Sequence, residues 1–221
     1  MKHLSRMITA HNCFCSFLFN LVALVVSVLI IPIALLIMHF DKYIGILVTT
    51  TIPASVIILA DYGPFNGITK KGFFIGMIIN SSHTEDFMKD AIRADQISHF
   101  MQIAFPTIVS MIIYAIKFPN EADIQFPIIT LTMILFSYSF TTVALMFLRN
   151  MLSNQVYTFL SFLLIMLISA LNTGMLILCM HEKIKISFMI FFLTVLILSI
   201  MISIFAFRYT TCHCLTNIKE N

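Results

Sequence analysis

Charge is the scarcest property of this sequence. Only 10% of the 221 residues are charged and 60% are hydrophobic, with a mean hydropathy of +1.00, whereas soluble domains carry roughly 25% charged residues. Thirteen Lys and Arg and ten Asp and Glu cannot cover the surface of a water-soluble globule of this length. The composition therefore excludes a soluble protein and predicts a membrane protein.

Motifs for nucleotide binding and hydrolysis are missing as well. The sequence contains no G-x-x-x-x-G-K-[ST] phosphate loop, no zinc-protease H-E-x-x-H and no G-x-S-x-G nucleophile elbow. We therefore expect no ATPase activity in this chain and no cofactor bound by it. The net charge of +3 is small and comes from loops, so it gives no indication of nucleic acid binding.

The five cysteines are an odd number and do not form an extracellular disulfide framework. Cys13 and Cys15 lie near the N-terminus, and Cys212 and Cys214 near the C-terminus. Pairs of zinc-binding cysteines are usually separated by two to four residues, whereas these are separated by one. We expect reduced thiols and no metal site, while a catalytic thiol beside a neighbouring histidine is the less favoured alternative.

Long apolar runs dominate what is present. Because their apolar character is continuous and lacks the alternation of a membrane β-barrel, they predict helices that satisfy their own backbone hydrogen bonds in lipid. The expected fold is all-α and polytopic, a single transmembrane domain over residues 1–221. Its six predicted spans cover residues 17–38, 44–60, 100–116, 126–148, 157–180 and 186–207. Prolines inside the spans, such as Pro53, predict kinks whose freed carbonyls are satisfied by neighbouring helices.

The basic residues predict the orientation. With both termini in the cytoplasm, nine of the thirteen Lys and Arg fall on the cytoplasmic side and four outside, as the positive-inside rule requires. The external connections are then short, and the cytoplasmic segment 61–99 is the longest loop.

A helix is predicted near the end of that segment. Ser82 and Glu85 match a capping box, and acidic residues occupy the first turn, so the helix should begin there and continue into the third span. It is either a solvated helix supported by a pair between Glu85 and Lys89, or a docking element for a soluble partner. Its pattern is only partly amphipathic. Phe87, Ala91, Ala94, Ile97, Ser98 and Met101 share one face, Asp90 lies at the edge of that face, and Met88 and Ile92 add a second apolar patch.

Polar residues inside the predicted spans are uncharged. Ion- and proton-coupled transporters need titratable groups at mid-depth, so their absence makes proton coupling unexpected. The hydroxyl and small residues favour helix–helix packing, for which Ala170-x-x-x-Gly174 is suited. The alternative is a mildly polar path for an amphipathic or hydrophobic cargo. Its candidate lining residues are Thr49, Thr50, Thr51, Ser137, Tyr138, Ser139, Thr141 and Asn172.

The layout resembles a known family. A basic N-terminal segment precedes six predicted spans, and a long connection joins spans two and three. That connection contains Ile78-Ile79-Asn80-Ser81-Ser82-His83-Thr84-Glu85-Asp86-Phe87, which leads into a helix. This layout resembles that of the permease subunits of ABC-2-type exporters. The small Gram-positive type used for peptide export, such as the phenol-soluble modulin exporters, is the most similar. In these families a Leu-Pro-x-Ser-Arg-Lys-like motif often precedes the helix, and here Asn-Ser-Ser-His-Thr replaces its proline and Ser-Arg-Lys.

The resemblance implies partners and a location. It implies a separate ATPase subunit that binds ATP and magnesium, a second permease copy or a related permease, and the bacterial cytoplasmic membrane. The residues expected to contact the ATPase are Glu85, Asp86, Lys89, Asp90 and Arg93. Two other functions stay open: a six-span substrate-binding subunit of a vitamin importer, and a membrane-embedded Cys/His peptide-processing protease.

Overall fold

The predicted all-α fold class is confirmed, while the six membrane crossings with both termini inside stay a prediction. The computed structural model describes residues 17–60, 84–121, 125–148, 154–181 and 186–220, and these contain helices and no strand. The helices are α2 (Phe17–Met38), α3 (Lys42–Ala60), α6 (Thr84–Lys117), α7 (Gln125–Leu148), α8 (Asn154–His181) and α9 (Ile186–Glu220). The predicted start of a helix beside the capping box is confirmed, because α6 begins at Thr84 and continues without a break into the third apolar run.

Five of these helices are long and apolar enough to cross a membrane. They are α3, α6, α7, α8 and α9, while α2 contributes a shorter apolar stretch, Val25–Met38, among the side chains that are described. The 34 residues of α6 correspond to about 51 Å, well beyond the ~30 Å of a bilayer's hydrocarbon core. The polar first part of α6 therefore extends past the apolar layer.

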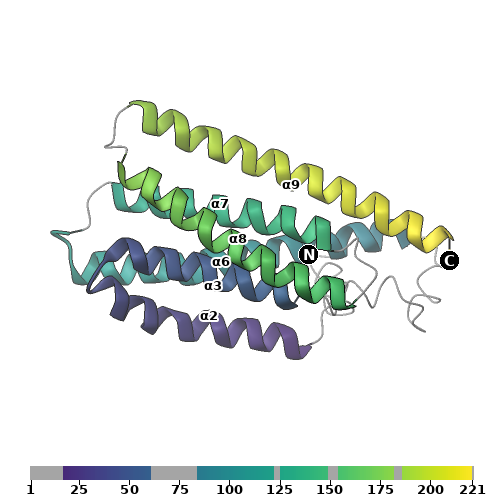
Figure 1. Cartoon of the computed structure of the whole chain (residues 1–221), viewed down its shortest axis with the longest axis horizontal. Coiled ribbons are helices and arrows are strands. Elements are labelled where there is room, and N and C mark those ends of the chain that lie inside the picture. Colours follow the sequence, from purple (N-terminus) through teal and green to yellow (C-terminus); the bar gives the residue numbers. More distant parts are fainter. Residues whose placement is uncertain (1–16, 61–83, 122–124, 149–153, 182–185, 221) are drawn as a thin grey trace.

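The helices form one bundle, with α2 and α9 at opposite edges (Figure 1). Helix α3 is central, since it packs against α2, α6, α7 and α8, and α7 packs against α3, α6, α8 and α9. One end of the bundle holds the α2–α3 turn and the end of α6, and we call it the turn end. The opposite end, where α6 begins and α9 finishes, is called the α6 end.

The α2–α3 turn is tight for two local reasons. The carboxylate of Asp41 accepts hydrogen bonds from the backbone N–H groups of Tyr43 (2.8 Å) and Ile44 (3.2 Å), and so caps the start of α3. Gly45 then allows α2 and α3 to approach, because a Cβ there would lie 2.1 Å from Cγ of Met38. The two helices consequently pack as an antiparallel pair over much of their length.

Apolar clusters form the core along the bundle. Near the turn end it is built around Met38, Ile46, Phe126 and Met133, all at most 1% exposed. Deeper along the helices, a second cluster joins α3, α6, α7 and α8. In contrast, Ala170 and Gly174 of α8 are exposed, and no atom lies within 4 Å of a Cβ added at Gly174. The predicted small-residue packing motif therefore faces outward in this chain.

Candidate functional site

The first turns of α6 present charged side chains at the α6 end. Glu85, Asp86 and Arg93 are exposed, and Lys89 is partly exposed. Lys89 forms the predicted ion pair with Glu85, and this hydrogen bond raises the pKa of Lys89 above its usual value. We call Glu85, Asp86, Lys89 and Arg93 the docking surface. It offers both signs of charge on one helix beyond the apolar layer.

The docking surface is attached to the last helix. The guanidinium of Arg93 lies over the ring of Phe207 in α9, 5.2 Å from its centroid, which is a cation–π contact. One turn further, the side-chain amide of Gln96 donates a hydrogen bond of 3.4 Å to the backbone oxygen of Ser203. These contacts therefore couple movement of the start of α6 to α9 as well as to the rest of α6.

Asp90, the fifth residue predicted to contact a partner, is buried in this chain. It is 2% exposed, and Asp95 is 4% exposed. A guanidinium nitrogen of Arg93 lies 3.7 Å from the Asp90 carboxylate, and the His99 imidazole 3.4 Å from that of Asp95. A buried carboxylate requires such partners. These contacts explain why two acidic residues are buried, although an apolar pattern assigns acidic residues to the solvent-facing side.

The apolar face of α6 that the sequence shows is only partly buried. Ile97 and Met101 are exposed by 56% and 52%. The buried side of this part of α6 carries Asp90, Ala91, Ile92 and Asp95 instead. One residue of the first apolar face, Ala91, and one of the second patch, Ile92, are therefore buried beside two acids that have partners on the next turn.

Two of the path candidates on α3 take part in contacts between helices. The hydroxyl of Thr107 in α6 lies 3.2 Å from the backbone oxygen of Thr49 and 2.7 Å from that of Ile103. Pro53 has no N–H to offer to the Thr49 oxygen four residues earlier, so Thr107 supplies the missing donor. This confirms for Pro53 that a neighbouring helix satisfies the freed carbonyl. On the other side of α3, the Asn172 amide of α8 donates to the Thr51 hydroxyl at 3.0 Å.

The remaining path candidates lie inside the bundle. Thr50 and Thr141 donate to backbone oxygens one turn earlier in their own helices and are at most 1% exposed. Tyr138 is 8% exposed and packs edge-on against Phe100. In the part of the chain that the structure describes, three buried polar atoms lack a hydrogen-bond partner. They are Ser110 Oγ, Ser137 Oγ and Asn172 Oδ1.

The turn end carries a cluster that the sequence did not single out. The Tyr114 hydroxyl donates to the Glu121 carboxylate at 2.6 Å, and the Lys42 ammonium donates to the Glu121 backbone oxygen at 2.6 Å. The rings of Tyr114 and Phe126 lie 5.4 Å apart, and the Lys42 ammonium lies 5.6 Å from the Phe126 ring centroid. Together these groups tie α3, α6 and α7 across this end. The sequence signal that could have indicated this cluster is the pair of opposite charges, Lys42 and Glu121, in two connections predicted on the same side of the membrane.

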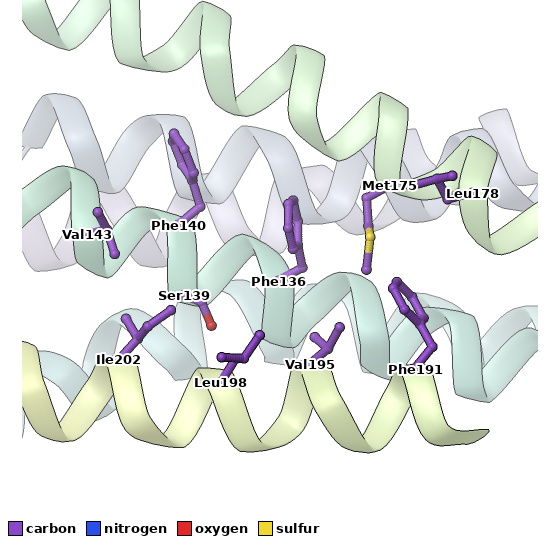
Figure 2. Close-up of a pocket in the computed structure, with 10 residues that line it drawn as sticks. All are labelled: Phe136, Ser139, Phe140, Val143, Met175, Leu178, Phe191, Val195, Leu198 and Ile202. Atoms are coloured by element: carbon purple, nitrogen blue, oxygen red, sulfur yellow. The ribbon is translucent and has the colours of Figure 1, made fainter. Parts of the chain in front are cut away.

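A cavity of about 300 Å³ lies between α7, α8 and α9. Figure 2 shows Phe136 and Phe140 of α7, Met175 of α8, and Phe191 and Ile202 of α9 around it. The cavity exists because α8 and α9 both pack on α7 while making little contact with each other. Ser139 is the path candidate that lines it. The lining is otherwise apolar, so the cavity offers no chemistry for catalysis.

The terminal cysteine pairs lie only partly within the described residues. Cys13 and Cys15 lie outside the described residues, Cys212 is exposed, and Cys214 lies in α9. Within the described part of the chain, His, Cys, Asp and Glu form no group of three suited to a metal ion. We found no matching family model, no matching curated protein and no matching solved structure.

Proposed function

We propose that the chain is the membrane-spanning permease subunit of an ATP-driven exporter of the ABC-2 type. In this proposal it crosses the bacterial cytoplasmic membrane six times with both termini inside, and it pairs with a second permease. A separate subunit binds and hydrolyses ATP. The cargo is an amphipathic or hydrophobic peptide, since the apolar runs carry no charge in their interiors.

The observation that carries the proposal is the continuity of α6. A single helix joins a charged docking surface to an apolar segment that packs on α2, α3 and α7. Because a helix transmits displacement along its axis, a partner that moves the docking surface moves the membrane-embedded part too. The contacts of Arg93 with Phe207 and of Gln96 with Ser203 extend this movement to α9.

Charge reversal on the docking surface tests the proposal. Tagged protein is purified from native membranes, partners are identified by mass spectrometry, and ATPase activity of the eluate is measured. We expect a co-purifying nucleotide-binding protein, and we expect Lys89→Glu with Arg93→Glu to reduce its recovery at least about tenfold, because charges at the rim of an interface set docking specificity. Unchanged recovery and transport would place the ATPase contact elsewhere.

Two controls separate docking from folding. Lys117→Glu reverses an exposed charge at the turn end and should leave recovery of the ATPase unchanged. Phe207→Leu removes the ring beneath Arg93 but keeps the charge of the docking surface. If Phe207→Leu alone abolishes co-purification, the loss in the double variant reflects the attachment of α6 to α9. Absence of any ATPase under mild detergent would refute the transporter-subunit proposal.

A further inference from the structure

The cavity between α7, α8 and α9 has the chemistry of a hydrocarbon site. Its one polar lining group is the Ser139 hydroxyl, which already donates to the Leu135 backbone oxygen at 2.7 Å. A polar ligand would therefore lose its hydrogen bonds to water without replacement. The aromatic rings of Phe136, Phe140 and Phe191 instead offer broad apolar contact.

The dimensions fit one extended hydrocarbon chain. Phe191 and Ile202 mark the two extremes of the lining on α9, eleven residues apart, which corresponds to about 16 Å along a helix. This is half of the ~30 Å hydrocarbon core, the depth of one leaflet. The volume of about 300 Å³ is twice that of the ~150 Å³ apolar cavity that takes one benzene molecule, which scales to about twelve carbon atoms.

The cavity is also continuous with the surface that faces lipid. Leu178 of α8 and Leu198 of α9 line it and are at the same time 58% and 51% exposed. Both belong to helices whose outward faces are apolar along the segments that qualify as membrane spans. A bilayer chain can enter sideways without passing any polar group.

We propose that this cavity is a binding site for one acyl chain of a membrane lipid, held between α8 and α9 against α7. The lipid completes the packing that α8 and α9 do not make with each other. The site does not depend on the proposed transport function, so either proposal can fail without the other.

Tryptophan fluorescence tests the site cleanly because the chain contains no Trp. Phe191→Trp places a reporter in the cavity, and Leu193→Trp places a matched reporter on the lipid-facing side, where Leu193 is 49% exposed. Both variants are reconstituted in phosphatidylcholine with brominated acyl chains, which quench Trp on contact, and then diluted into detergent without bromine. We expect Phe191→Trp to lose quenching at least about tenfold more slowly, a difference of ~1.4 kcal/mol if it arises from affinity.

Filling the cavity provides the second arm. In the Phe191→Trp background, Val195→Phe adds a ring to the cavity and should abolish the slow phase, while Ile197→Phe adds the same ring on the exposed face and should leave it intact. For the otherwise unmodified chain, mass spectrometry of the detergent-purified protein should find a retained lipid that Val195→Phe loses. Equal rates for the two reporters would overturn the site. Quenching of Leu193→Trp alone would show that protein, such as a second copy of this chain, covers the cavity.

Discussion

The hydrogen bond to the Thr49 oxygen, which has no N–H partner at Pro53, permits a quantitative test. Thr107→Val keeps the shape of the side chain and removes the donor that lies 3.2 Å from the Thr49 oxygen. Hydrogen bonds between membrane helices contribute ~0.6 kcal/mol on average and up to ~1.7 kcal/mol. The Thr107 hydroxyl has one hydrogen and also lies 2.7 Å from the Ile103 oxygen. We therefore expect a loss of about 1 kcal/mol in the free energy of unfolding, because the Thr49 oxygen is left buried without a partner.

The control is a buried threonine that bonds only within its own helix. Thr130 is fully buried, and its hydroxyl donates to the Phe126 oxygen at 2.7 Å. That oxygen already has an N–H partner one turn later in α7. Thr130→Val should consequently cost less than about half of the Thr107→Val effect. Both are measured by equilibrium unfolding in mixed micelles, followed by circular dichroism.

A double-mutant cycle isolates the cause. Pro53→Ala restores an N–H that can bond to the Thr49 oxygen, so Thr107→Val should cost little in that background. The expected coupling between positions 53 and 107 is about 1 kcal/mol. If Thr107→Val lowers the free energy of unfolding equally with Pro53 and with Ala at that position, Thr107 does not compensate for the proline.

Two further pairs of substitutions test local packing by the same unfolding measurement. Gly45→Ala should destabilise the chain by about 1–3 kcal/mol, because the new Cβ would meet Met38 at 2.1 Å. Its control, Gly174→Ala, has open space around it and should be neutral or stabilise the chain by up to ~1 kcal/mol through helix propensity. Equal effects of the two substitutions would contradict the close approach of α2 and α3. Tyr114→Phe should cost about 1 kcal/mol of stability by removing the hydrogen bond to Glu121. Its control, Tyr138→Phe, removes a hydroxyl without a hydrogen bond in the described part of the chain and should change stability less. The reverse order would show that the turn-end cluster does not stabilise the fold.

The helix positions were predictable because lipid leaves few alternatives. An apolar run in hydrocarbon must satisfy its own backbone, and the limits of α2 and α7 agree with the apolar runs to within one residue. Helix α9 extends to Glu220, thirteen residues past the predicted span. That extension contains polar and charged residues, which apolar periodicity does not count although they do not end a helix.

The orientation of side chains was less predictable than the helices. On α6 the acids Asp90 and Asp95 are buried, and their partners Arg93 and His99 follow at three and four residues. A pattern of apolar residues cannot anticipate which charges are buried with partners. The cavity beside α9 was equally inaccessible to sequence reasoning, since it lies where α8 and α9 make little contact with each other.

The hydroxyl and amide groups inside the bundle illustrate how the structure refines an ambiguous pattern. The Thr51 hydroxyl and the Asn172 amide join α3 to α8, as expected for groups that hold membrane helices together, whereas the Thr49 hydroxyl bonds within α3. Ser137 Oγ and Asn172 Oδ1 are buried without a partner in the described residues, a state that costs stability unless another conformation, water or a ligand satisfies them. A polar path that opens during transport would supply those partners. Of the eight path candidates, Ser137 and Asn172 are therefore the two whose polar atoms the packing explains least.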